Sequence, residues 1–251
     1  MTDPARPSRL TWQTVTLRDA HSEAQAARTL TFSAPQWKGH LAGQHVDVRL
    51  TAPDGYTAQR SYSIASPNRP GQLDLTVQRV TDGEVSPYLV DNMLAGDQLE
   101  VRGPIGGWFV WRPDDPGAIL LVAGGSGVVP LMAMIRERDG HGISTPFRLV
   151  YSVRTPHDRL YAEELATRAA AGTHLTLSLI YTRTAAGDAG RPPGRLRADD
   201  LADSPWNDHR PIHSYICGPT GFVEAAAGLL EAAGHAPDSI RTERFGPTGG
   251  T

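Results

Sequence analysis

The sequence has 251 residues, of which 39% are hydrophobic and 20% charged, and its formal net charge is −3. A chain of this length and apolar content can build two domains with separate cores. The negative charge argues against nucleic acid as the main partner. The single cysteine, Cys217, excludes an intramolecular disulfide and an iron–sulfur cluster held by about four thiolates of this sequence.

No segment of the sequence predicts a link to a membrane. Met1–Arg9 is polar and lacks the apolar centre of a signal peptide. The longest apolar run, Ala118–Ala123, is far shorter than the roughly 20 residues that span a bilayer. We therefore expect a cytoplasmic protein without a membrane span, and one cysteine fits a reducing compartment.

Up to about Phe109, short candidate strands are separated by turns. Alternation of apolar and polar residues is clear in Leu73–Val77, and turn residues recur at Asp54-Gly55 and Asp82-Gly83. The candidate strands are Thr11–Leu17, Thr29–Ser33, His45–Leu50, Ser61–Ile64, Leu73–Val80 and Gln98–Arg102. Short strands at this spacing predict a small antiparallel β-barrel, to which we assign residues 8–112.

After a polar stretch at residues 111–117, strands alternate with helices, and we assign residues 116–246 to a second domain. The candidate strands are Ala118–Ala123, Phe147–Ser152, Leu175–Tyr181, His213–Cys217 and Ile240–Glu243. The candidate helices are Pro130–Arg138, a segment from an N-cap at Asp158 to about Ala170, and Gly221–Ala233. This alternation predicts a doubly wound parallel sheet in an α/β domain.

The segment Arg60-Ser61-Tyr62-Ser63 contains the groups that a flavin needs. On one strand, Arg60 and Tyr62 point to the same face, where they offer positive charge for phosphates and a flat partner for the ring. Ser63 can offer a hydrogen bond beside the ring. The alternative is an ordinary edge strand with a surface arginine.

Two further segments of the first half contain small residues at places that suit a phosphate. Gly83, Glu84, Val85 and Ser86 form a turn that opens a short helix, with Ser86 as N-cap and Pro87 at the first helical position. The free amides of such a helix start suit a pyrophosphate, although a capped helix without a ligand fits equally. A second small-residue turn follows at Gly103–Gly107.

The second half contains a glycine-rich turn and a later Cys-Gly-Pro segment, each between a strand and a helix. Gly125, Ser126, Gly127 and Pro130 follow the first apolar strand, where glycines let the backbone approach a pyrophosphate. The usual dinucleotide fingerprint is absent, because Pro130 replaces its last glycine and no acidic residue stands about 20 positions later. Cys217, Gly218 and Pro219 end a later strand, where open parallel sheets bind ligands.

Together these motifs, in this order and spacing, resemble the ferredoxin–NADP reductase superfamily over nearly the whole chain. The resemblance implies an FAD-binding barrel domain followed by an NAD(P)-binding domain. It implies that Arg60 reaches the pyrophosphate, that Tyr62 stacks on the isoalloxazine, and that Ser63 lies by its N5 atom. Cys217 would lie against the nicotinamide as a shaping residue rather than a nucleophile. FAD is favoured over FMN because Arg60 and the Ser86 region bracket a diphosphate.

The strand ends favour NADPH over NADH as the nicotinamide donor. Arg154 follows the second strand of the α/β domain, and Thr182 and Arg183 follow the third. Neither place has the acidic residue that favours a free 2′-hydroxyl, and arginines there would pair with a 2′-phosphate. The alternative is two solvated arginines.

The end of the sequence departs from the plant-type pattern of the superfamily, in which the chain ends at an aromatic residue that covers the flavin. Here Phe245 is followed by six more residues. Phe245 remains a candidate to cover the ring, and plain packing is the alternative. His209 and His213 have a metal-like spacing, but Pro211 between them disfavours a shared helix face, so we expect no metal.

The expected function is that of a flavoprotein oxidoreductase. Hydride would pass from NAD(P)H to FAD, and electrons would then pass to a separate acceptor such as a ferredoxin, flavodoxin, oxygenase or haem protein. One alternative is a free-flavin or ferric-chelate reductase. Another is a nucleotide-binding subunit that kept the fold without the activity.

Overall fold

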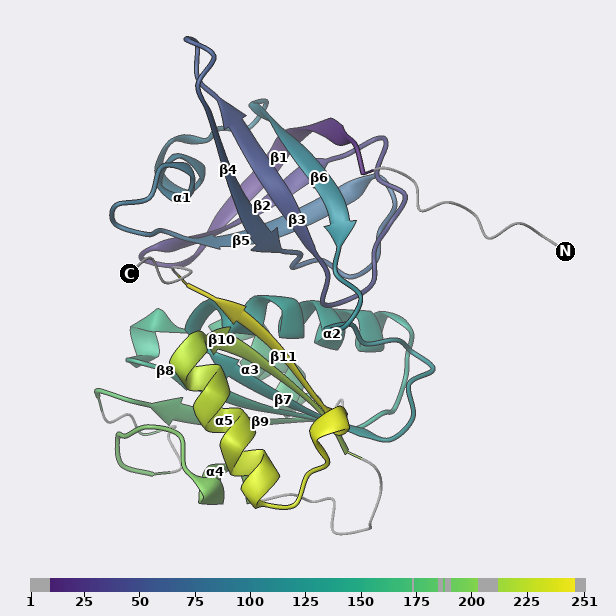
Figure 1. Ribbon diagram of the computed structural model, residues 1–251, viewed down its shortest axis with the longest axis vertical. Coiled ribbons are helices and arrows are strands. Elements are labelled where there is room, and N and C mark those ends of the chain that lie inside the picture. Colours follow the sequence, from purple (N-terminus) through teal and green to yellow (C-terminus); the bar gives the residue numbers. More distant parts are fainter. Residues whose placement is uncertain (1–9, 173, 185–186, 188–190, 203–211, 247–251) are drawn as a thin grey trace, which may run out of the picture.

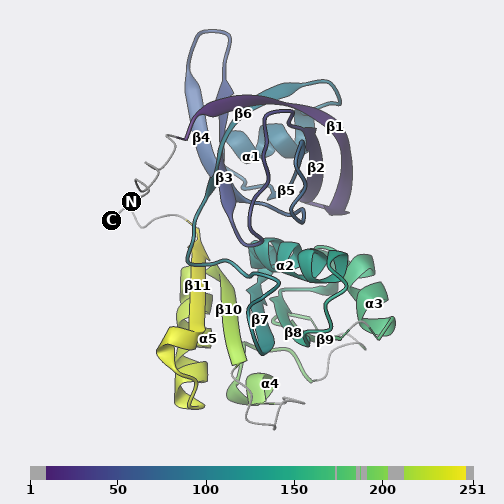
Figure 2. The same cartoon turned by 90° about the vertical axis from the view of Figure 1, so that its right-hand side faces the viewer.

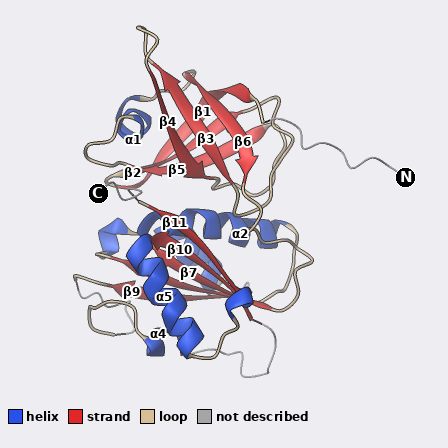
Figure 3. Ribbon diagram, in the orientation of Figure 1, coloured by secondary structure: helices blue, strands red, loops and turns tan. Residues whose placement is uncertain are grey.

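The computed structural model describes residues 10–172, 174–184, 187, 191–202 and 212–246. Two units of different architecture follow one another along the chain and stack end to end (Figure 1). The first is built almost entirely of strands, and the second combines strands with helices (Figure 3). Within the described residues, no helix has both the length and the apolar composition that a membrane crossing needs.

The first unit is a six-stranded antiparallel sheet with the order β4-β3-β6-β1-β2-β5. Its strands are β1 (Trp12–Ala24), β2 (Ala27–Ser33), β3 (His45–Thr51), β4 (Thr57–Ser63), β5 (Gln72–Gln78) and β6 (Gln98–Ile105). A bridge between Ile64 and Leu75 joins the ends of the order, which partly closes the sheet into a barrel. The helix α1 (Val85–Pro87) and a π-helical turn (Tyr88–Asn92) lie between β5 and β6.

The second unit is a parallel sheet with the order β11-β10-β7-β8-β9. Its strands are β7 (Ala118–Gly124), β8 (Phe147–Val153), β9 (Leu175–Tyr181), β10 (Ile212–Pro219) and β11 (Ile240–Phe245). Its helices are α2 (Val128–Gly140), α3 (Ala162–Ala170), α4 (Ala198–Ala202) and α5 (Thr220–Ala232). Single 3₁₀ turns lie at Gly125–Gly127, Pro156–Asp158 and Pro237–Ser239.

Helices cover both faces of this parallel sheet, which explains its apolar strands. Every residue of β7 and β8 is buried, as expected of strands that have no solvent face. The helices α2 and α3 pack on one face, and α4 and α5 pack on the other (Figure 2). The predicted fold class, an antiparallel barrel followed by a doubly wound parallel sheet, is therefore confirmed. The exact domain limits of 8–112 and 116–246 stay a prediction, and residues 8 and 9 lie outside the described part.

Two predicted helix starts are wrong. Asp158 does not cap α3, because its carboxylate accepts hydrogen bonds from the amide and hydroxyl of Thr155 in the preceding loop, at 2.9 and 2.7 Å. The helix begins only at Ala162, after Tyr161 adopts a left-handed backbone conformation with φ of 56°. Ser86 is not the N-cap of α1 but lies inside it, and its hydroxyl accepts a hydrogen bond from the Val80 amide.

Candidate functional site

The predicted flavin strand is β4, an edge of the barrel sheet. Its partner β3 pairs Val48 with Arg60 and Val46 with Tyr62 on one face, and Asp47 with Ser61 on the other. The Ser61 hydroxyl donates to Asp47 at 2.7 Å, which ties this strand to its neighbour from the far face. Burial raises the pKa of Tyr62 to about 12, so its ring is neutral and half-buried, as a stacking partner requires.

The predicted pyrophosphate end brings Arg60 next to the start of α1. The guanidinium of Arg60 lies 3.6 Å from the carboxylate of Glu84, which also accepts a hydrogen bond from Tyr56 at 2.9 Å. Val85 and Ser86 are buried under this point, and a side chain at Gly83 would come within 3.0 Å of the Ser86 hydroxyl. The side chains of Arg60 and Glu84 are 56% and 54% exposed, so the guanidinium is accessible to an anion.

In the second unit, the glycine-rich turn and the Cys-Gly-Pro segment meet at the carboxyl edge of the sheet. The strands β7 and β10 are neighbours, with Ala123 opposite Cys217. A Cβ atom on Gly127 would lie 2.1 Å from the carbonyl oxygen of Cys217, so only glycine permits this approach. Gly125 has a φ of 56°, and Pro130 is buried in the first turn of α2, where its missing amide hydrogen breaks no helical bond. A Cβ atom added to Gly218 would lie 3.2 Å from the Cα atom of Gly124, so these two glycines also pack closely.

The thiol of Cys217 is chemically quiet in this setting. The residue is 1% exposed, and burial, together with the carboxylate of Glu243, raises the pKa of the thiol well above its ordinary value. A protonated thiol is a poor nucleophile. The environment therefore fits a packing surface better than a covalent catalyst.

A residue that the sequence analysis missed, Glu243, lies where the two units meet. On β11, Glu243 pairs with Cys217 of β10. Its carboxylate lies 3.6 Å from the imidazole of His45 on β3, and His45 in turn pairs with Ser63 of β4. Burial raises the pKa of Glu243 to about 7 and lowers that of His45. Burial thus disfavours the charged form of both groups in this contact. The second carboxylate oxygen is buried and has no hydrogen-bond partner among the described residues.

Glu243 could have been suspected from the sequence, because it follows the apolar start of the last strand and stands two residues before Phe245. His45 gave no such signal, since its role depends on a contact with the other unit. Phe245 ends β11 opposite Pro219, and 36% of its surface is exposed. The end of β11 points toward the barrel (Figure 1).

The structure brings the two candidate arginines of the second unit together. The amide of Arg183 donates to the carbonyl oxygen of Arg154 at 3.0 Å, and the amide of Thr182 donates to that of Val153 at 2.9 Å. Both arginines are exposed. From β10 to β9 the sheet takes three strand-to-strand steps, or roughly 14 Å, so Cys217 and the arginines can lie at opposite ends of one extended ligand.

The linker between the units is fixed to the second sheet. The carbonyl oxygen of Val110 accepts hydrogen bonds from the Tyr215 hydroxyl at 2.9 Å and from Arg241 at 2.5 Å. Arg241 also donates to the Tyr215 hydroxyl at 2.8 Å. These contacts hold the barrel in a defined place over the carboxyl ends of the strands.

A separate polar hollow of 660 Å³ lies between the barrel and the helices α2 and α3. Several of its charged side chains are already paired: Arg136 binds Glu164, and Glu137 accepts a hydrogen bond from the backbone amide of Asn68 at 2.7 Å. None of the predicted site residues lines it. We assign no ligand to this hollow. Of the two histidines considered for a metal, His209 lies outside the described residues.

Comparison with known proteins gives two matches to family models. An oxidoreductase FAD-binding domain matches residues 14–110, and an oxidoreductase NAD-binding domain matches residues 121–228. A glycine betaine monooxygenase reductase subunit of Pseudomonas aeruginosa is 34% identical over 211 residues. The alignment covers 82% of this chain and 56% of that protein, so the chain spans little more than half of this relative's length.

Solved structures agree with these matches. A cytochrome P450 reductase from Amycolatopsis superposes with a TM-score of 0.81 at 26% identity, covering 95% of this chain and 71% of that one. A ferredoxin NADP⁺ reductase from Neisseria gonorrhoeae, solved with FAD and NADP, shares the fold with a TM-score of 0.78 at 19% identity, covering 93% and 98%. The chain belongs to the oxidoreductases that join an FAD-binding domain to an NAD-binding domain, and it has the fold of ferredoxin–NADP reductase.

Proposed function

We propose that this chain is an NAD(P)H-dependent flavoprotein reductase that passes electrons from bound FAD to a separate acceptor protein. The observation that carries the proposal is the meeting of the two motif sets at one junction. There the flavin strand β4 and the Cys-Gly-Pro segment of β10 are linked through His45 and Glu243. A cytoplasmic location is part of the proposal and rests on the single cysteine of the sequence.

The residues of the barrel fit FAD. Arg60 is an accessible cation for the pyrophosphate beside the start of α1, and Tyr62 provides a neutral aromatic face. Ser63, at the end of β4, would hydrogen-bond the reactive edge of the ring. When bound, FAD supplies an acceptor for two electrons that can then be released one or two at a time.

The residues of the second unit fit a nicotinamide nucleotide. The Gly125–Gly127 turn before α2 offers backbone amides to the pyrophosphate. Cys217 closes the nicotinamide end with a protonated thiol, and the unpartnered oxygen of Glu243 can accept a hydrogen bond from a carboxamide. The protein would orient the two cofactors and exclude water, since the cofactors supply the redox chemistry.

We further propose that NADPH is the preferred donor. The hydrogen bond between Arg183 and Arg154 places two exposed guanidinium groups on adjoining backbone. A 2′-phosphate can pair with both, whereas NADH offers no such group.

The acceptor is proposed to be an oxygenase or its ferredoxin. The support comes from the names of relatives, which are reductase or electron transfer components of oxygenase systems. One is the electron transfer component of a toluate 1,2-dioxygenase from Pseudomonas putida, 26% identical over 89% of this chain and 64% of that protein. The alternative, a free-flavin reductase, differs in that the reduced flavin must leave the protein as a product.

Anaerobic reduction tests the proposal. The protein is loaded with FAD, desalted and mixed with NADPH under nitrogen, and the flavin absorbance near 450 nm is recorded. We expect a yellow protein that keeps its flavin through desalting and loses the absorbance at once. A wild-type protein that does not bind FAD, or binds it without bleaching, would refute the proposal. Flavin lost on desalting, with rapid turnover of added flavin, would favour the free-flavin alternative.

A further inference from the structure

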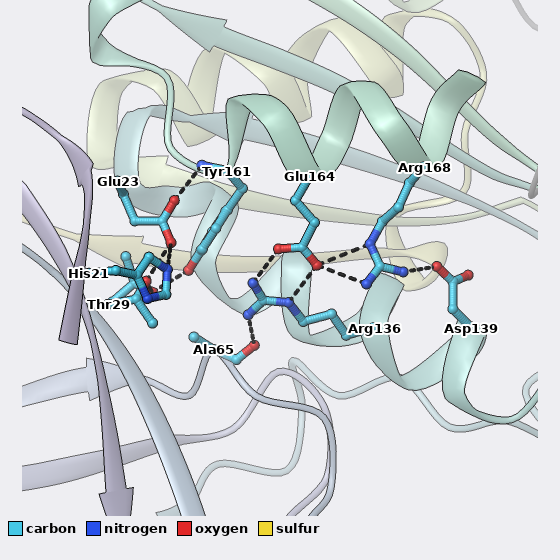
Figure 4. Close-up of polar contacts among 10 residues, drawn as sticks. His21, Glu23, Thr29, Ala65, Arg136, Asp139, Tyr161, Glu164 and Arg168 are labelled. Atoms are coloured by element: carbon cyan, nitrogen blue, oxygen red, sulfur yellow. Dashed lines mark hydrogen bonds and ion pairs between the residues drawn. The ribbon is translucent and has the colours of Figure 1, made fainter. Parts of the chain in front are cut away.

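A closed ring of hydrogen bonds ties the second unit to the barrel at Tyr161. Figure 4 shows Tyr161 beside Glu23 and Thr29. The amide of Tyr161 donates to the carboxylate of Glu23 at 3.0 Å, and its hydroxyl donates to the hydroxyl of Thr76. The Thr76 hydroxyl contacts that of Thr29 at 2.7 Å, and Thr29 donates to the second oxygen of Glu23 at 2.7 Å. Only Tyr161 comes from the second unit.

The hydroxyl hydrogen bonds of the ring all run in one donor-to-acceptor direction, as a count of the hydroxyl hydrogens shows. Thr29 uses its only hydroxyl hydrogen on Glu23, so the hydrogen between the two threonines must come from Thr76. The Thr76 oxygen is then free to accept the hydrogen of Tyr161. Every hydroxyl hydrogen in the ring therefore has a defined acceptor, and the carboxylate of Glu23 completes it.

The ring is built by unusual backbone at both contributing places. Glu23 lies at an irregularity in the pairing of β1 with β2, between the Ser22–Arg28 and Ala24–Ala27 pairs, where a bulge can re-aim a side chain. Tyr161 is 2% exposed and has a left-handed φ of 56°, a backbone conformation that is unfavourable for a residue other than glycine. The guanidinium of Arg136 lies 4.8 Å from its ring. Such a conformation persists only where its surroundings determine it.

Tyr161 ends the same short segment that begins with Arg154. Within that segment Thr155 and Asp158 form a reciprocal cap, and the Leu160 amide donates to the hydroxyl of Tyr151 at 3.1 Å. The segment is therefore a stiff turn rather than a loose loop. Its exposed start, Arg154, follows β8 directly and accepts a backbone hydrogen bond from Arg183, so the segment connects the arginine pair to Tyr161.

We infer that Thr76 and Glu23 of the FAD-binding domain act through Tyr161 as positioning residues for the Arg154–Arg183 pair, and so set the affinity for the phosphorylated adenosine end of the nicotinamide nucleotide. The inference rests on the proposed role of these arginines. Through this ring, one domain adjusts a ligand subsite on the other without touching the ligand.

Variants of Thr76 test the ring without altering the arginines. Thr76→Val keeps the shape and removes the hydroxyl, whereas Thr76→Ser keeps the hydroxyl. Tyr161→Phe removes the donor at the other end and serves if Thr76→Val does not fold. The control, Asp91→Asn, breaks the ion pair with Arg79 on the barrel surface and leaves the ring intact. The FAD-loaded full chain is titrated calorimetrically with adenosine 2′,5′-bisphosphate and with 5′-AMP, and flavin content is measured.

We expect the Kd for adenosine 2′,5′-bisphosphate to rise about three- to tenfold in Tyr161→Phe, the effect of losing one buried hydrogen bond, and at least as much in Thr76→Val, which loses two. Thr76→Ser and Asp91→Asn should stay within about twofold of wild type, and all variants should keep their flavin. Equal affinities in all variants, or equal losses in Thr76→Val and Thr76→Ser, would overturn the inference while leaving the arginine assignment intact. A wild-type protein that binds both adenosine ligands equally would overturn the arginine assignment and the inference together.

Discussion

Replacing Glu243 by Gln should change how the stability of the protein depends on pH. The carboxyl pKa is raised by burial from 4.5 to about 7 in the folded chain. At roughly 1.36 kcal/mol per pKa unit, that difference corresponds to about 3 kcal/mol. Because the folded pKa is the higher one, Glu243 favours folding fully below pH 4.5, and this contribution is lost as the pH rises through 7.

Gln has the shape of Glu but stays neutral, so the variant does not lose this stability as the pH rises. The free energy of unfolding of Glu243→Gln, minus that of wild type, should therefore grow by about 3 kcal/mol between pH 4.5 and pH 8. Following only the change of this stability difference with pH removes any effect of the amide that is the same at every pH. Urea unfolding of the FAD-loaded protein, followed by tryptophan fluorescence and circular dichroism at several pH values, measures it. Coincident transitions are needed before free energies are compared.

Asp47→Asn is a control with the opposite sign. Burial raises the pKa of Asp47, but hydrogen bonds from Arg102 and Ser61 outweigh that effect and hold the pKa below its ordinary value. Its contribution is present at neutral pH and is lost only as the pH falls below about 4. Asp47→Asn should be less stable than wild type by a constant amount between pH 5 and 8. Parallel stability curves for Glu243→Gln and wild type over that window would refute the burial argument.

Three further predictions concern the ligands. Arg60→Ala combined with Tyr62→Ala should weaken FAD binding by about two to three orders of magnitude, measured by fluorescence titration, because a charge-assisted hydrogen bond and a stacking contact are both lost. Cys217→Ser should slow flavin bleaching in stopped-flow experiments at unchanged FAD content; a covalent cysteine adduct in the mass spectrum during turnover would contradict the shaping role. Arg154→Ala with Arg183→Ala should collapse an about ten- to thousandfold preference for NADPH in kcat/KM, mainly by harming NADPH. If the wild type used NADPH and NADH equally at low salt, the prediction for Arg154 and Arg183 would be contradicted.

The parts of the fold that local patterns encode could be predicted from the sequence. The buried strand β7 appears as a continuous apolar run, β8 as a mostly apolar segment, and the turn at Gly125–Gly127 falls between strand and helix as expected. The predicted FAD-binding and NAD-binding domains match known family models over residues 14–110 and 121–228. The roles of individual site residues remain predictions.

What depends on contacts between distant segments could not be predicted. The strand β1 continues to Ala24 through polar residues because β2 folds back on it, although no alternation marks that extension. The start of α3 is set by the conformation of Tyr161, which the barrel helps to hold. Likewise, His45 and Glu243 meet only because one unit lies on the other.

The attachment of Val110 also limits how the two domains can move. A hinge at this linker would have to break the hydrogen bonds from Tyr215 and Arg241, at a cost of roughly 1–3 kcal/mol, and would leave a buried carbonyl without partners. These bonds therefore favour one relative orientation of the two domains. A nicotinamide nucleotide would then meet two domains that are already aligned, so little of its binding energy would be spent on aligning them.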